Sequence, residues 1–322
     1  LLQSFLIMDY SYFSFRTEQG ILRASIAGVL LLSFLGIIMG FLSSSSAIIF
    51  DSFYGILDSL MTMLALLVVR LISASTSGDL VNSRLSERFT MGFWHLEPIV
   101  LGVNGTLLIV AAVYALINSV DSFISGGREI LFGYSIMFTA VSLIVEFSLG
   151  MSIGKANRKI KSELLGLDSK AWLMSSAMSV AYLCAFIFGY FAEGTSLSHL
   201  TPYVDPAVLA IVCLVVIPVP IGTVKQALAD ILLVTPSELK NHVDSVAEDV
   251  VKKYGFVSYR AYVARVGRGR QIELYFIAPK NWKAMTLDEW DKLRDEIGKL
   301  ISGDDPDLWL TIVFTADLEW GE

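Results

Sequence analysis

The sequence predicts an all-α transmembrane domain of six helices, followed by a small α+β domain at its C-terminal end. The chain of 322 residues is 54% hydrophobic and only 17% charged, against about 45–50% and about 25% in soluble domains. Between Ile21 and Val224 it contains apolar stretches near the roughly 20 residues that cross a bilayer. Beyond Thr235 the charge density rises. We therefore expect a transmembrane domain at 21–226 and a soluble domain at 236–322.

Six apolar segments are the predicted spans, and the loops between them predict the orientation. The spans cover residues 21–43, 46–72, 97–119, 130–154, 168–192 and 203–226. Lys and Arg collect in cytoplasmic loops. Here they flank the first span and fill the second and fourth loops (Arg16, Arg23, Arg70, Arg84, Arg88, Lys155, Arg158, Lys159 and Lys161). We expect a multi-pass protein of the cell (inner) membrane, with the N-terminal segment 1–20 and the C-terminus both cytoplasmic.

The soluble tail reads as helix, strand, strand, helix, strand. Its expected elements are a helix from Pro236, strands at 257–266 and 271–278, a helix from Thr286 to Ile301 and a strand at 308–314. Thr286 is a suitable N-cap, because acids follow it in the first turn. An αββαβ order of this size predicts a small sandwich of the ferredoxin-like or metallochaperone-like kind, in which helices cover one sheet face and leave the other open.

Composition excludes several other classes of protein. A net charge of −7 offers no basic face, so we expect no nucleic-acid partner. Cys184 and Cys213 lie in apolar segments without disulfide or CxxC spacing, and we expect both to be small buried hydrophobes. Residues 1–19 lack a positive start and a small-residue cleavage site, so a signal peptide is not expected.

Ionisable residues in the second span are the first candidates for function. Insertion of Asp51 or Asp58 into the bilayer costs roughly 2.5–3.5 kcal/mol for each residue, so we expect each to have a structural or functional role. Tyr54 lies between them on the same helical face. Two carboxylates and a phenol suit an oxygen-rich cation site; the alternative is that hydroxyls and amides of neighbouring helices satisfy the acids. Glu146 in the fourth span and Asn104 in the third are further polar candidates.

The fifth span repeats part of the second. Asp51-Ser52 is matched by Asp168-Ser169, and seven residues later Asp58-Ser59 is matched by Ser175-Ser176. Internal repeats are typical of transporters, whose substrate site lies at the repeat interface near the bilayer midplane. A chance match of two short segments is the alternative.

Several segments resemble the motifs of one family. The second span reads Ser-Ala-Ile-Ile-Phe-Asp51-Ser-Phe-Tyr54-Gly-Ile-Leu-Asp58-Ser, and the entry to the third reads Arg88-Phe-Thr-Met-Gly92-Phe-Trp-His95-Leu-Glu97-Pro98. The sixth span opens with Asp205-Pro206 and closes with Ala229-Asp230. With the six-span layout and the αββαβ tail, these segments resemble the cation diffusion facilitator family of proton-coupled divalent metal exporters. The resemblance implies a homodimer in the lipid bilayer that exchanges a metal cation for protons, without enzymatic activity or a tightly bound cofactor.

The resemblance also implies which residues form the transport site. The family's four ligand positions fall on Tyr54, Asp58, Ala171 and Ser175, of which only Asp58 keeps an obvious ligand. Zinc favours a tetrahedral set of nitrogen, sulfur or carboxylate ligands. The three histidines of the chain lie outside these positions (His95, His199 and His242). We therefore expect a harder ion with oxygen ligands, such as iron(II), manganese or magnesium.

A charge pair is the last feature that the resemblance implies. In the family, the basic residue two before the third-span Glu pairs with the Asp that ends the sixth span and braces the dimer. These positions are His95 and Asp230 here, and a His would make the brace sensitive to pH. The alternative places His95 in an aromatic cluster with Phe93 and Trp94.

Three functions follow from these observations. The first is a dimeric metal-cation/proton antiporter with an altered site. The second is a transport-inactive member of the family that acts as a sensor, scaffold or partner subunit, which the missing ligands favour. The third is a membrane enzyme, for which the sequence lacks a convergent nucleophile, base and oxyanion donors.

Overall fold

The computed structural model describes residues 18–76, 89, 92–160, 163–303 and 307–321. The chain divides into two compact units. Unit 1 comprises Leu1–Thr62 and Thr106–Ile221, and unit 2 comprises Met63–Gly105 and Gly222–Glu322. The expectations at residues 1–17 and those for Arg84, Arg88 and Lys161 lie outside the described residues.

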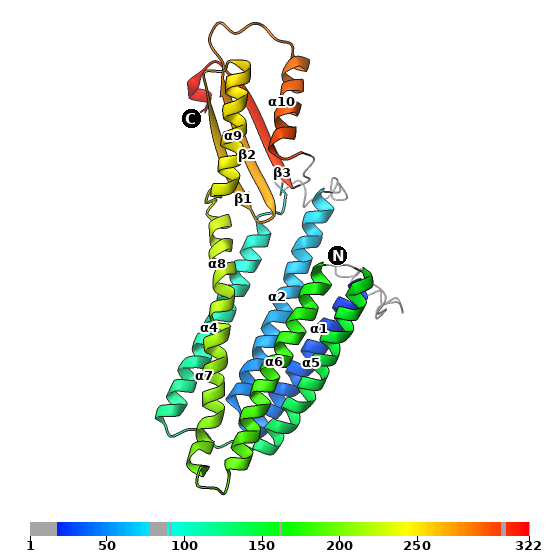
Figure 1. Ribbon diagram of the computed structural model, residues 1–322, viewed down its shortest axis with the longest axis vertical. Coiled ribbons are helices and arrows are strands. Elements are labelled where there is room, and N and C mark those ends of the chain that lie inside the picture. The colour runs from blue at the N-terminus through cyan, green and yellow to red at the C-terminus, as the bar shows by residue number, and fades with distance from the viewer. Residues whose placement is uncertain (1–17, 77–88, 90–91, 161–162, 304–306, 322) are drawn as a thin grey trace. The chain divides into compact units, whose positions relative to one another are not determined.

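The elements follow one another from a helical N-terminal part to a mixed C-terminal part (Figure 1). They are α1 (Glu18–Ser43), α2 (Ser46–Thr76), α4 (Leu96–Ile124), α5 (Phe132–Ile160), α6 (Glu163–Ala192), η1 (Ser198–Tyr203), α7 (Val204–Val216), α8 (Pro218–Ile231), α9 (Ser237–Tyr254), β1 (Ser258–Val266), β2 (Gly269–Ile277), α10 (Leu287–Ile301), β3 (Leu308–Thr315) and η2 (Leu318–Gly321).

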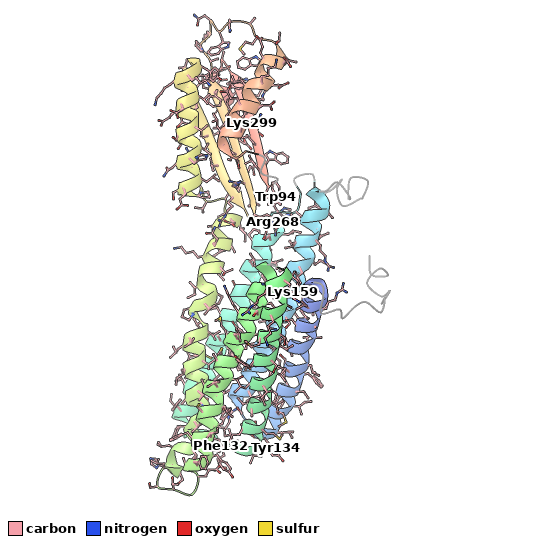
Figure 2. All side chains as sticks on the ribbon, turned by 45° about the vertical axis from the view of Figure 1, so that its right-hand side comes forward. Trp94, Phe132, Tyr134, Lys159, Arg268 and Lys299 are labelled. Carbon is pink, nitrogen blue, oxygen red and sulfur yellow. The ribbon has the colours of Figure 1, made fainter. Side chains whose placement is uncertain are left out.

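Six helical segments are long and apolar enough to cross a membrane, which confirms the predicted spans. They are Gly20–Ser43, Ser46–Ile72, Leu96–Ile124, Phe132–Ile160, Asp168–Ala192 and Ser198–Ile231. Large apolar side chains such as Leu31, Ile144 and Phe191 are exposed on them, as expected where lipid surrounds a bundle. In α5, Lys159 lies at the opposite end from Phe132 and Tyr134 (Figure 2).

The sixth span differs from the single helix that the hydropathy predicts. It is divided at Ile217 into α7 and α8. Pro218 and Pro220 lack the N–H that an unbroken helix needs, whereas proline suits the first turn of a new one. The N–H of Ile217 still donates to the carbonyl of Cys213 at 2.9 Å, so the helical hydrogen-bond pattern of α7 continues up to the break.

The helices of unit 1 pack through small residues. A Cβ on Gly150 of α5 would lie 3.0–3.2 Å from side-chain atoms of Leu173 and Trp172 of α6, so a larger residue there would force these side chains to shift. The Ser169 hydroxyl donates to the Gly150 carbonyl at 2.9 Å. Cys213 is buried in a core cluster with Phe186 and other residues, as predicted. The prediction that Cys184 is buried is wrong, because it lies on the outer face of α6, which lipid and not protein would cover.

Unit 2 contains the predicted αββαβ tail. The strand order is β1-β2-β3, with β1 and β2 antiparallel and β2 and β3 parallel. Ile272 in β2 lies opposite Val263 in β1 and Leu310 in β3, which sets the register. Apolar side chains of one sheet face form a core with α9 and α10 (Val243, Ala247, Val250, Val263, Ile272, Leu274, Phe276, Leu293, Ile297, Ile301 and Ile312), and both helices lie on that face (Figure 1).

The first prediction concerns this tail. We expect the fragment 236–322 to fold without a metal, because its core is drawn from its own residues and it has no Cys and a single His. The Nε2–H of that residue, His242, donates to the carbonyl of Ile301 at 3.0 Å. Thermal melts by circular dichroism with and without chelator should coincide. A midpoint that falls by many degrees with chelator contradicts the prediction, because loss of a tightly bound ligand lowers stability.

Candidate cation site

The start of α2 is fixed by a buried carboxylate. Ser45 caps the helix, since its hydroxyl accepts the N–H of Ile48 at 3.2 Å and donates to Asp205 of α7. Asp205 also accepts the N–H groups of Ser46 at 2.9 Å and Ala47 at 3.3 Å. Its side chain is 1% exposed. The first amides of a helix lack intrahelical partners and attract an anion, so this arrangement determines where α2 begins.

A cavity of about 180 Å³ lies between α1, α2, α5 and α6, inside unit 1. All five residues predicted as cation ligands line it, although they come from two spans (Asp51, Tyr54, Asp58, Asp168 and Ser175). Glu146 of α5 lines it too. Within the described part of the chain, the lining contains no His, Cys, Lys or Arg. The side-chain oxygens that it could offer to a cation are therefore carboxylate, phenol and hydroxyl oxygens.

The sequence repeat corresponds to equivalent faces of α2 and α6. The first residue of each pair, Asp51, Asp58, Asp168 or Ser175, faces the cavity. The second residue of each pair is a buried serine (Ser52, Ser59, Ser169 and Ser176). Three of these hydroxyls donate to backbone carbonyls, at 2.7–2.9 Å. In each repeated pair, the first residue thus faces the cavity, and the serine that follows it is a small hydrogen-bond donor packed between helices.

Two buried side-chain oxygens at the cavity lack a hydrogen-bond partner within the described ranges. Ser25 of α1 donates to Oδ1 of Asp168 at 2.9 Å, and Trp172 donates to the Ser25 hydroxyl at 2.7 Å. Among the described residues, Oδ2 of Asp168 and the hydroxyl of Ser142 have no hydrogen-bond partner. An unsatisfied buried polar atom costs about 1–3 kcal/mol. Both atoms belong to lining residues, so a water or a cation in the cavity would satisfy them.

The acids do not converge as a preformed cage. No three His, Cys, Asp or Glu side chains in the described ranges lie close enough to hold one metal ion together. A tetrahedral zinc site requires such a group. Magnesium instead keeps several waters and binds through one or two carboxylates. The observed geometry therefore suits a hydrated cation better than a dehydrated one.

Glu146 was a polar candidate in the sequence, but its place in the cavity was not predicted. The signal that could have located it is a polar stripe on α5. Ser135, Thr139, Ser142 and Glu146 follow one another at intervals of three or four residues, and all four are buried. A buried polar stripe inside a membrane helix indicates that its face lines the bundle interior.

The two residues of the expected brace have other partners within unit 2. Asp230 accepts hydrogen bonds from Arg265 of β1 at 3.0 Å and from Gln226 at 2.6 Å. The His95 ring stacks on Phe89, with 6.0 Å between ring centroids, and Phe89 in turn packs on Phe93 at 4.9 Å. A brace between His95 and Asp230 of two copies stays a prediction.

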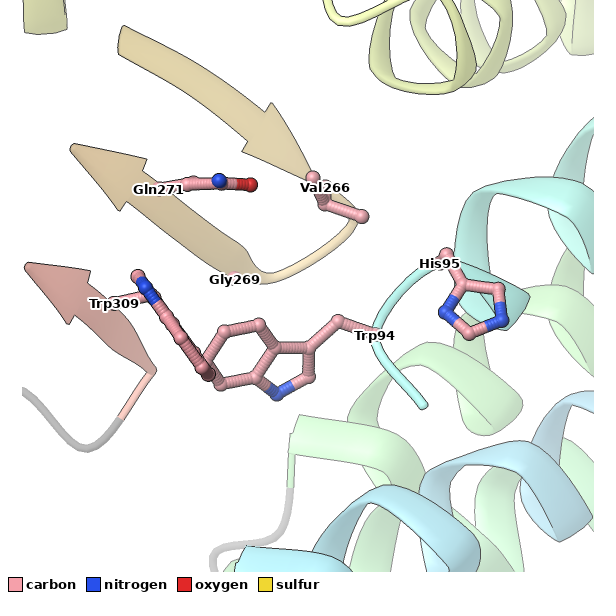
Figure 3. A pocket seen from close by; sticks show the side chains of 6 residues that line it. All are labelled: Trp94, His95, Val266, Gly269, Gln271 and Trp309. Carbon is pink, nitrogen blue, oxygen red and sulfur yellow. The ribbon is translucent and has the colours of Figure 1, made fainter. Parts of the chain in front are cut away.

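The β1–β2 turn approaches the start of α4 closely (Figures 2 and 3). A side chain at Gly269 would collide with the Trp94 ring, and Gly267 adopts φ = 63°, which favours glycine. Arg268 pairs with Glu97, with 3.0 Å between Nε and Oε2. A second cavity of about 110 Å³ lies here, lined in part by Trp94, His95 and Trp309 (Figure 3).

Comparison with known proteins gives one match. The profile of the cation efflux transmembrane domain matches residues 22–232, which is more than half of the chain. The match begins near the start of α1 and ends just after α8, so it includes all six spans and every residue that lines the cavity. No curated protein matches the sequence.

The second prediction tests the anchor at the start of α2. Asp205→Ala leaves the N–H groups of Ser46 and Ala47 without an acceptor, so we expect unfolding to need roughly 2–6 kcal/mol less, at about 1–3 kcal/mol for each group. Denaturation of the purified protein in detergent measures this change. Glu193→Ala, which removes an exposed carboxylate, is the control. Equal stability of the two variants would contradict the role of Asp205.

Proposed function

Because the chain belongs to the cation efflux family, we propose that it exports a divalent metal cation in exchange for protons through the cavity between α1, α2, α5 and α6. The chain is a multi-pass membrane transporter of cations and not an enzyme. The proposal extends this family assignment to a site, an ion class and a coupling mechanism.

One observation carries the choice of site. Five residues selected by residue type and repeat position, on two spans more than a hundred residues apart, line one cavity. Hydroxyls and amides alone would satisfy the acids if their role were structural, but Oδ2 of Asp168 has no such partner among the described residues. A cation site therefore explains the unpartnered oxygen of Asp168, which a purely structural role of the acids does not explain.

The oxygen lining supports the choice of ion. Carboxylates, carbonyls and water suit magnesium and manganese, whereas imidazole and thiolate suit zinc. We propose that a hydrated magnesium, manganese or iron(II) ion binds at Asp51, Tyr54, Asp58, Asp168 and Ser175. No three acids of the described residues reach one ion together, so some of these residues bind it through the waters that complete its coordination sphere.

Proton exchange follows from the same carboxylates. A carboxylate must lose its proton before it binds a cation, so cation binding releases protons. In an acidic cavity the two ligands therefore compete, and a proton gradient drives the cation out when the site opens to the opposite side. The cation is the cargo, and no resident cofactor is part of the proposal.

Assembly and orientation form the second part of the proposal. We propose a homodimer with both termini in the cytoplasm of a cell and the spans in its inner membrane, with segment 1–20 before the membrane domain 21–226. The tail 236–322 forms the dimer contact, and a His95–Asp230 pair between the copies braces it. Light scattering of the purified protein and of the fragment 236–322 tests the stoichiometry.

A transport-inactive role is the second candidate. Ala171 and Ser175 present no charged ligand to the cavity, and no three acids converge among the residues that the structure describes. A sensor, scaffold or partner subunit would keep the fold and the cavity without moving ions. Uptake of manganese or magnesium by liposomes that contain the purified protein separates the two functions.

The third prediction concerns Asp58. Asp58→Ala removes a carboxylate from the cavity wall, and we expect it to abolish cation binding and transport while the protein remains folded. Manganese uptake into liposomes and calorimetry measure the effect. Asp121→Ala, which removes an exposed carboxylate at the end of α4, should transport normally. Undiminished transport by Asp58→Ala would refute the site.

The fourth prediction restores zinc ligands. The triple variant Tyr54→Asp, Ala171→His and Ser175→Asp adds an imidazole and two carboxylates to Asp58 around one cavity. We expect it to bind zinc at least tenfold more tightly than the natural sequence does, because this set suits tetrahedral zinc. Calorimetry measures both affinities. Equally tight zinc binding by the unmodified protein would overturn the proposed preference for a harder ion.

A further inference from the structure

The inference concerns Glu146, the acid on α5. This residue is 7% exposed and lines the cavity together with residues of α1, α2 and α6. Burial of a carboxylate inside a span needs compensation. Ser179 of α6 supplies part of it by donating to Oε2 at 2.7 Å.

The packing of α5 on α6 determines where Glu146 points. Near one end of the contact, Ser169 donates to the carbonyl of Gly150 at 2.9 Å. About three turns along α6, Ser179 bonds to Glu146, one turn before Gly150 on α5. Two hydrogen bonds at separate levels fix the register of the helices. The carboxylate of Glu146 is therefore held in place at the cavity wall.

The lining of the cavity is asymmetric in charge. The α2 face carries two carboxylates, Asp51 and Asp58, whereas α6 presents Asp168 but then Ala171 and Ser175. At the level where α6 has no charged group, α5 offers one. Glu146 thus supplies a carboxylate near Ser175, where α6 itself presents no charged group to the cavity.

A second, independent observation points to a ligand beside Glu146. Ser142 lies one turn earlier on α5, lines the same cavity and is 5% exposed. In the described ranges its hydroxyl has no hydrogen-bond partner. Buried hydroxyls are nearly always bonded, to protein or to ordered water. An unbonded hydroxyl here fits a site that holds a polar occupant, such as a water of a hydrated cation.

We propose that Glu146 is a cation-binding residue of this cavity, and that carboxylates of α2, α5 and α6 hold a hydrated divalent cation, with at most two of them as direct ligands and the others bonded to its waters. The proposal rests on the proposed function. Glu146 binds through a bridging water or directly, and Ser142 hydrogen-bonds to the hydration shell. Ser179 is a positioning residue, because it contacts Glu146 and does not line the cavity.

The test compares three variants of the full-length protein in detergent. Glu146→Gln keeps the size and an oxygen that accepts from Ser179, but removes the charge. We expect manganese affinity by calorimetry to fall at least tenfold, with the melting temperature of the cation-free protein within a few degrees of the natural one. Ser179→Ala keeps the charge and should lose only a few-fold. Glu193→Gln, an exposed control, should bind manganese unchanged.

The outcomes separate this inference from the proposed function. Unchanged manganese affinity in Glu146→Gln overturns the role of Glu146 and leaves the other ligands standing. Absence of manganese and magnesium binding by the natural protein overturns both. If the cation-free Glu146→Gln protein melts at a much lower temperature than the natural protein, the variant Glu146→Asp distinguishes loss of the binding charge from loss of stability. Affinity that recovers with the aspartate charge supports the proposal, and stability that recovers without affinity refutes it.

Discussion

Serine hydroxyls hold three carboxylates of the membrane helices, and the arrangement of unit 1 depends on these bonds. A carboxylate at the centre of a span costs roughly 2.5–3.5 kcal/mol, and a hydrogen bond to a charged group returns about 1.5–3 kcal/mol. In each case the serine and the acid come from different parts of the chain (Ser25 with Asp168, Ser45 with Asp205, and Ser179 with Glu146). Each bond therefore compensates a charge and also joins α1 to α6, α2 to α7, or α5 to α6.

Small residues make these bonds possible. A side chain at Gly36 of α1 would collide with Ser52 of α2, and one at Gly55 would come within 2.7 Å of the Ser33 hydroxyl. Glycine and serine let helix backbones approach closely without a hydrophobic driving force. The short serine side chain then reaches the neighbouring helix.

The sequence predicts the features that depend on a local pattern of residues. It does not predict the roles of residues whose partners lie far away in the chain. Hydropathy sets the spans because the bilayer requires about 20 apolar residues, and the capping pattern at Thr286 gives the start of α10, with its capping box, correctly. The repeat brings Asp168 into the cavity with Asp58. Asp205 looked like a motif residue only, because its partners lie about 160 residues away. The sequence did not assign Glu146 to the site, because the polar stripe on α5 that contains it is not part of the repeat shared by α2 and α6.

The cap of α2 has a consequence for the order in which the protein assembles. Ser45 leaves the ribosome 160 residues before Asp205. At about 5–20 residues per second, the interval between them is roughly 8–32 s. Throughout that interval the amides of Ser46 and Ala47 have no carboxylate to accept them. The second helix therefore reaches its final state only after the last helix is inserted, and a chain cut short before residue 205 would carry an open helix end in the bilayer.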